Sequence, residues 1–90
     1  CPMAAVASGF GARDVNLAAT VRAAFAAWEQ EIAHAAEARG LKPKDAEAFA
    51  SAMVAAMEGA MIVSKAQASS APHINASRAL KALAASLRAN

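Results

Sequence analysis

The sequence predicts an all-α fold, made of one short helix and three longer helices. About a third of the 90 residues are alanine, which favours helices and buries little surface. Apolar residues recur every three or four positions over long stretches, which is the period of an amphipathic helix. The glycines and prolines fall mainly between those stretches, and no run of β-branched residues alternates with polar residues as in a strand.

Length and charge predict a single domain, residues 1–90, without a polyanion-binding surface. The formal net charge is only +2 and the charges are spread along the chain, which argues against a surface for nucleic acid or anionic membranes. The single Cys1 excludes an internal disulfide and, with no signal peptide in the sequence, indicates the cytoplasm. The chain begins Cys-Pro-Met, so we expect it to have lost an N-terminal part.

The short helix is predicted over residues 2–8. Pro2 suits a first helical turn, and Gly9 and Gly11, on either side of Phe10, end the helix.

The second helix is predicted from about Asp14 to Arg39. Asp14 is a candidate N-cap, Gly40 a candidate residue just past the C-terminal end, and Arg39 suits the negative end of the helix dipole. One apolar stripe runs along this helix: Leu17, Val21, Phe25, Trp28, Ile32 and Ala35 with Ala36.

The third helix is predicted over about 43–68 and the fourth from 73 or 75 to 88, separated by the turn "SSAPHIN". Pro43 fits the first turn of the third helix, where a missing N–H costs nothing. The main stripe of the fourth helix is Ala76, Leu80, Leu83, Ala84 and Leu87.

The third helix carries two apolar strips when its residues are placed at about 100° intervals. The bulky strip is Phe49, Met53, Met57 and Met61, with Ala46, Ala50 and Ala60 between them. The small strip is Ala48, Ala52, Ala55, Ala56, Gly59, Val63 and Ala66. Glu47, Glu58 and Lys65 share a thin polar strip and argue against a membrane span. Two apolar strips predict that this helix is covered on two sides.

We expect the bulky strip to face the second helix and the small strip to admit a close helix crossing. Such a crossing would offset the cost of Gly59 in a helix interior, about 1 kcal/mol relative to alanine. Because the fourth helix also has two apolar flanks, the hypothesis is a homodimer in which the last two helices of each chain form a four-helix bundle. The predicted interface is Ala52, Ala55, Ala56, Gly59, Val63, Ala66, Ala79, Leu80, Leu83 and Leu87.

The order of elements resembles the C-terminal domain of TetR-family transcriptional regulators, most closely the LmrA/YxaF-like branch. The resemblance covers essentially the whole chain: "CPMAAVASGF", then "VRAAFAAWEQEIAHAAEARGL", then "DAEAFASAMVAAMEGAMIVSKAQAS", then "RALKALAASL". It implies a domain that binds a small hydrophobic or aromatic effector and dimerises through its last two helices. Operator DNA would be bound only through an N-terminal helix-turn-helix domain, which this sequence lacks.

The predicted effector pocket lies between the second helix and the bulky strip. Its candidate residues are Phe25, Trp28, Met53, Met57, Glu58 and Met61. Aromatic rings supply contact area, methionine adapts to varied ligands, and Glu58 would select a cationic or hydrogen-bonding group. The competing interpretation is core packing for the apolar residues and a solvated position for Glu58.

No residue pattern indicates catalysis, a metal or a cofactor. Neither His34 nor His73 has a metal-ligand partner at a suitable spacing, and no pattern in the sequence indicates a histidine that would activate Cys1. The alternative to a regulatory domain is a structural helical module that oligomerises without a ligand. A membrane-surface helix is disfavoured because the stripes lack a Lys/Arg-rich polar face.

Overall fold

The computed structural model describes residues 3, 9 and 14–89, and within these it is all-helical, as predicted. Three helices follow one another: α2 (Val15–Ala38), α3 (Pro43–Gln67) and α4 (Ala71–Ala89). Apart from Met3 and Gly9, the short helix predicted over 2–8 and the glycine break after it lie outside the described residues.

Both ends of α2 are fixed by local hydrogen bonds at the predicted residues. The Asp14 carboxylate accepts a hydrogen bond from the N–H of Leu17 at 3.0 Å, which caps the N-terminus. At the other end Gly40 adopts a φ of 105°, and the N–H of Leu41 donates to the carbonyl of Ala36 at 3.1 Å. This is a Schellman arrangement, in which the Leu41 side chain folds back into the cluster with Ala36.

The C-terminal end of α3 uses the same arrangement without a glycine. Ala68 has a left-handed backbone, with φ 49° and ψ 46°. The N–H of Ser69 donates to the carbonyl of Ser64 at 3.1 Å, and that of Ala68 to the carbonyl of Lys65 at 3.3 Å. An alanine in this conformation carries a steric cost that glycine does not.

The helix α4 begins at Ala71, earlier than the predicted start at 73 or 75. The Ser69 hydroxyl accepts a hydrogen bond from the N–H of Ala71 at 3.1 Å, and the carbonyl of Ser70 accepts from Ile74 at 3.1 Å. Pro72 therefore sits in the first turn, where its missing N–H and fixed φ are compatible with a helix. The prediction was wrong because it took Pro72 as a break.

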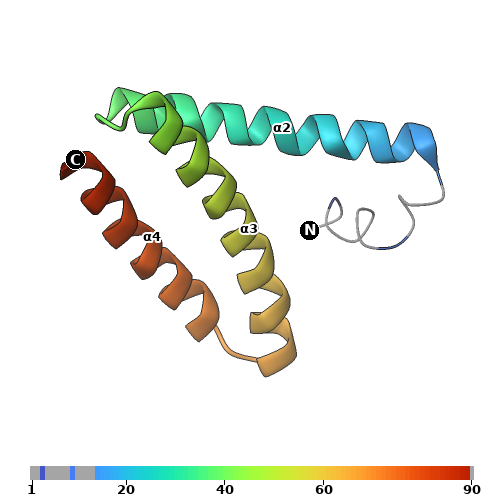
Figure 1. Cartoon of the computed structure of the whole chain (residues 1–90). Helices are drawn as coiled ribbons and strands as arrows, with labels where there is room; N and C mark the ends of the chain where they lie inside the picture. The colour runs from blue at the N-terminus through green and yellow to red at the C-terminus, as the bar shows by residue number, and fades with distance from the viewer. Residues whose placement is uncertain (1–2, 4–8, 10–13, 90) are drawn as a thin grey trace.

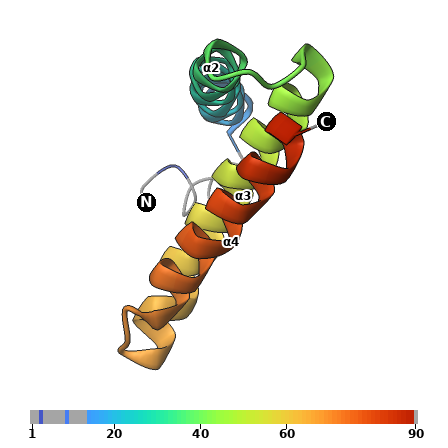
Figure 2. The ribbon, with the colours of Figure 1, turned by 90° about the vertical axis from the view of Figure 1, so that its left-hand side faces the viewer.

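The helices α3 and α4 form one layer, and α2 packs against one side of it (Figure 1 and Figure 2). Figure 1 shows α4 running antiparallel beside α3, while α3 crosses the C-terminal part of α2. Figure 2 shows α3 and α4 aligned in one layer and α2 end-on against one side of that layer. The Cα atoms extend over 43 × 32 × 13 Å, so the molecule is much thinner in one direction than in the other two.

The buried core is small and rich in alanine. Ala46 and Ala50 of α3 are the most buried described residues, each 0% exposed. Side chains of this size are fully enclosed only where helix backbones approach closely. The buried residues are Val21, Ala36, Leu41, Ala46, Ala50, Val54 and Ala60.

The chain's own helices cover α3 on two sides, and the small strip is covered by neither. Ala50 faces α2, since it lies in a groove with Ala26 and Ala33. Phe49 and Met53 lie where α3 meets both α2 and α4, whereas we had expected the bulky strip to face α2 alone. Among the described residues, a Cβ atom added to Gly59 would meet no atom within 4 Å, so none of the described helices crosses there.

By length and composition alone, α3 is long and apolar enough to cross a membrane. Its most apolar 18-residue window has a mean hydropathy of 1.4. Core helices of soluble proteins pass the same test, so one such helix is weak evidence for a span. We describe α3 as the central helix of the fold because it packs between α2 and α4.

Replacing Ala68 with glycine is expected to raise the free energy of unfolding by about 0.5–1 kcal/mol, since glycine adopts a positive φ without a Cβ clash. Gly40→Ala is the matched opposite change and should lower the free energy of unfolding by about 1 kcal/mol or more. Urea denaturation at one fixed protein concentration measures both. A loss of stability in Ala68→Gly would contradict the left-handed conformation at this helix end.

Ala50→Leu is expected to destabilise the fold by about 1–3 kcal/mol, because the fully buried site between α2 and α3 has no room for a larger side chain. The control is Ala23→Leu, at an exposed position of α2, which should change stability by no more than about 0.5 kcal/mol. Equal effects of the two substitutions would mean that α2 and α3 are not in close contact at Ala50.

Candidate functional site

An apolar groove lies where the three helices converge, at the end of α2, the start of α3 and the end of α4. We call it the corner groove. Its volume is about 310 Å³, at the lower end of the range for small-molecule sites. The residues that line it are Ile32, Ala35, Ala36, Arg39, Leu41, Phe49, Met53, Ala84 and Arg88.

A second groove, of about 320 Å³, continues from the corner groove between α3 and α4. We call it the α3–α4 groove. The two grooves share Phe49, Met53 and Ala84, so they form one apolar depression. The α3–α4 groove is lined by Phe49, Met53, Met57, Ser77, Leu80, Lys81 and Ala84.

Helical spacing explains why these side chains meet. Each helix contributes residues three or four positions apart, such as Phe49 with Met53, or Ala84 with Arg88. Residues at this spacing lie on one helix face, one turn above the other. Because α3 crosses α2 near one end and has α4 along its side, the three faces converge near Leu41.

The charged groups of the corner groove are both cationic. Arg39 and Arg88 are the charged residues in its lining, and both side chains are otherwise exposed. The Arg39 Nη1 donates a hydrogen bond to the carbonyl oxygen of Ala35 at 3.3 Å, one turn earlier. The guanidinium of Arg39 is therefore held at the edge of the groove.

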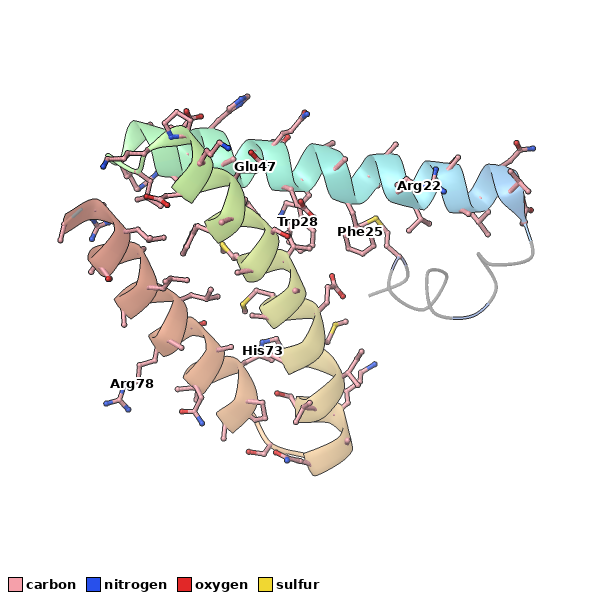
Figure 3. All side chains as sticks on the ribbon, in the orientation of Figure 1. Arg22, Phe25, Trp28, Glu47, His73 and Arg78 are labelled. Carbon is pink, nitrogen blue, oxygen red and sulfur yellow. The ribbon has the colours of Figure 1, made fainter. Side chains whose placement is uncertain are left out.

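Two of the six predicted pocket residues line these grooves. Met53 lines both, and Met57 lines the α3–α4 groove. The rings of Phe25 and Trp28 stack with centroids 6.5 Å apart and planes inclined by 22°. Figure 3 shows both rings on the side of α2 that faces α3, and neither lines the two grooves.

Glu58 and Met61, which were also predicted for the pocket, are half-buried on α3 outside both grooves. The Oε2 atom of Glu58 is buried and has no hydrogen-bond partner among the described residues, which is unlike a freely solvated acid. A role for Glu58 in binding stays a prediction.

Sequence reasoning missed most of the corner groove. Ile32, Ala35 and Leu41 belong to the far end of α2 and the turn after it, while Ala84 and Arg88 come from the end of α4. The stripes of the second and fourth helices included Ile32, Ala35 and Ala84. No pattern within one helix indicated that these three helix ends meet.

The predicted interface residues of α3 are mostly exposed in the single chain. Ala52, Ala55, Gly59 and Ala66 are exposed, Val63 is 42% exposed, and Ala56 is half-buried. Ile62, which was absent from the predicted set, is 60% exposed on the same side of α3.

The predicted interface residues of α4 divide into two groups. Ala79 is exposed and Leu83 is 39% exposed. Leu80 lines the α3–α4 groove, and Leu87 packs against the buried cluster of Ala36, Leu41 and Ala46. Leu80 and Leu87 thus contribute to packing within the chain.

Polar groups gather on the other side of the contact between α2 and α3. Glu29, His34, Glu37 and Glu47 line a groove of about 450 Å³ there. Among the described residues, no group of three or more His, Cys, Asp or Glu side chains is placed to hold a metal ion. His73 is half-buried in the first turn of α4 and lies beside α3 (Figure 3).

A family model matches most of the chain. The sequence model of a family described as "Transcriptional regulator LmrA/YxaF-like, C-terminal domain" matches residues 1–79. The matched range includes α2, α3 and the first half of α4. No curated protein and no solved structure matches the chain.

Proposed function

The chain belongs to the LmrA/YxaF-like C-terminal domains of TetR-family transcriptional regulators, and we propose that it is the dimerising, effector-binding domain of a repressor. Membership of the family makes it part of a transcription regulator. Homodimerisation, binding of a small hydrophobic or aromatic effector, and release of operator DNA are the parts that we propose.

The observation that carries the dimer proposal is the amount of surface that the single chain leaves exposed. Its accessible surface is 6082 Å², whereas a compact monomeric protein of this mass exposes about 4,900 Å². The radius of gyration is 14.6 Å, compared with about 12 Å for a compact chain of this length. The excess of roughly 1,200 Å² exceeds the roughly 800 Å² that each partner contributes to a standard interface.

The side of the layer away from α2 is the best-supported interface. Ala50 faces α2, and the small strip lies on the opposite side of α3. Ile62, Val63 and Leu83 add larger exposed apolar side chains to it. Small residues let helices approach closely, so two copies of α3 and α4 would build a four-helix bundle.

The effector, in this proposal, binds in the depression formed by the corner groove and the α3–α4 groove. Its apolar lining and the flexible Met53 and Met57 suit a small hydrophobic or aromatic molecule. Because α4 contributes to both this depression and the proposed interface, a ligand that prefers one spacing of α3 and α4 would shift the dimer between two arrangements. In this proposal a helix-turn-helix domain outside these 90 residues binds the operator, and the protein is located in the cytoplasm. The mechanism involves no catalysis.

A structural module that oligomerises without a ligand is the second candidate. The exposed small strip supports it as well as it supports a regulator. The two candidates differ only in whether the apolar depression binds small molecules.

Ala55→Glu is expected to convert a homodimer to a monomer, because it places a charge in the middle of the small strip. Sedimentation equilibrium at several concentrations measures the change. The matched control is Ala23→Glu, at an exposed position of α2, which should leave the dimer unchanged. A monomeric unmodified chain, or dimers that tolerate Ala55→Glu, would contradict the proposed interface.

Gly59→Ala is expected to have opposite effects on the stability of the single chain and on dimer formation. In the single chain the added Cβ meets open space, so helix propensity should stabilise the monomer by about 1 kcal/mol. In a dimer with a close crossing at Gly59, the same Cβ should weaken association. Urea unfolding of an Ala55→Glu monomer, with and without Gly59→Ala, measures the first effect, and sedimentation of the single variant measures the second. If Gly59→Ala left the dimer affinity unchanged, the helices of the two chains would not cross closely at Gly59.

A survey of apolar aromatic compounds by thermal shift is expected to give ligands that stabilise the fold. A compound at about 100 times its Kd should add about 2.7 kcal/mol to the free energy of unfolding. Ala84→Phe fills the shared part of the two grooves and should abolish the shift, while Ala85→Phe, at an exposed position of α4, should retain it. No stabilising compound at all would favour the structural module.

A further inference from the structure

We propose that the corner groove binds an amphipathic anion: a small molecule with an aromatic or alkyl body and one carboxylate. This inference names the ligand class of the proposed effector site and rests on that function. The carboxylate is inferred from the two positive charges at the groove. The apolar lining alone does not specify the charge of a ligand.

The body of such a ligand would lie on the apolar lining. Ile32, Leu41, Phe49 and Met53 supply side chains from α2, from the turn after it and from α3. A volume of about 310 Å³ accommodates a small molecule but no peptide helix or protein loop. An uncharged apolar ligand would satisfy this part of the groove equally well.

The carboxylate would lie between Arg39 and Arg88. These cations come from different helix ends, and no acidic side chain is among the described residues that line the groove. Among the described residues, the hydrogen bond to the Ala35 carbonyl is the one interaction of the Arg39 guanidinium, and Arg88 has none. Both guanidinium groups therefore keep donors for a ligand carboxylate, which Arg binds with paired hydrogen bonds.

The two neighbouring grooves have a different set of charged residues in their lining. Glu29, Glu37 and Glu47 line the groove on the other side of α2 and α3, which would repel an anion. The α3–α4 groove contains one cation, Lys81. The corner groove is the one of these three that combines an apolar lining with two cations.

Compensation of helix dipoles is the competing explanation for the two arginines. Arg39 follows the last residue of α2 and Arg88 lies in the last turn of α4, where a positive charge is favourable without any ligand. Dipole compensation predicts a stability effect for both arginines and no preference for a charged ligand.

The test compares 2-naphthoate with its uncharged analogue 2-naphthamide on the unmodified chain. Titrations are followed by NMR of protein labelled with ¹³C at the methionine methyl groups. Met53 lines both grooves, whereas Met57 lines the α3–α4 groove and not the corner groove, so a shift of Met53 that exceeds any shift of Met57 reports on the corner groove. We expect naphthoate to bind about tenfold more tightly than naphthamide, since two exposed charge pairs each contribute about threefold. High salt should reduce this preference through screening.

Arginine variants test whether Arg39 and Arg88 cause the preference for naphthoate over naphthamide. Arg39→Gln and Arg88→Gln should each lower naphthoate affinity by about threefold, and the double variant should bind both compounds equally. Affinity for naphthamide should not change. Arg78→Gln removes an exposed cation of α4 that does not line the corner groove and should leave both affinities as they were.

Two results would overturn the inference, and they are distinguishable from each other. If both compounds shift the Met53 signal with equal affinity, the groove binds ligands without regard to charge, so the proposed effector function stands and the anion class fails. If neither compound shifts Met53, the corner groove is not the site, and the thermal-shift survey then decides whether the domain binds effectors elsewhere. Neither result depends on the folding of a variant.

Discussion

The close approach of helix backbones at the alanines of α3 is the contact on which this structure depends. Ala46 and Ala50 are completely buried, although each offers only a methyl group to its neighbours. The buried side chains among the described residues are small or medium in size, and such a core stabilises a chain only where helices touch along their backbones. That requirement brings α2 and α4 to two sides of α3 and produces a thin layer instead of a rounded domain.

A thin layer cannot enclose its own apolar surface, and the two sides of this one differ. The side away from α2 carries the small strip with exposed Ile62 and Val63, which suits a second helical layer. The side that bears α2 has the continuous depression around Phe49 and Met53. In the proposed function one side holds a partner chain and the other a ligand, and α4 contributes to both.

The corner groove depends on the same geometry, because its walls are the ends of three helices. A change in the angle between α3 and α4 would move Ala84 and Arg88 relative to Arg39, and would also move Leu83 at the proposed interface. The proposed regulation depends on this shared movement of α4. A bound molecule would favour the arrangement in which it contacts all three helix ends.

Patterns within the sequence were enough to predict the helical fold, the ends of α2 and the two strips of α3, because periodicity, caps and glycines act over a few residues. The order of the helical segments was enough for the family resemblance. The early start of α4 was missed, since the fit of Pro72 depends on how Ser69 and Ser70 cap the first turn. Packing of Leu80 and Leu87 within the chain, and the place of Arg39 and Arg88 in the lining of one groove, became apparent from the arrangement of the helices in space. These outcomes follow from the crossing angles of helices far apart in the chain, which no pattern within a single helix specifies.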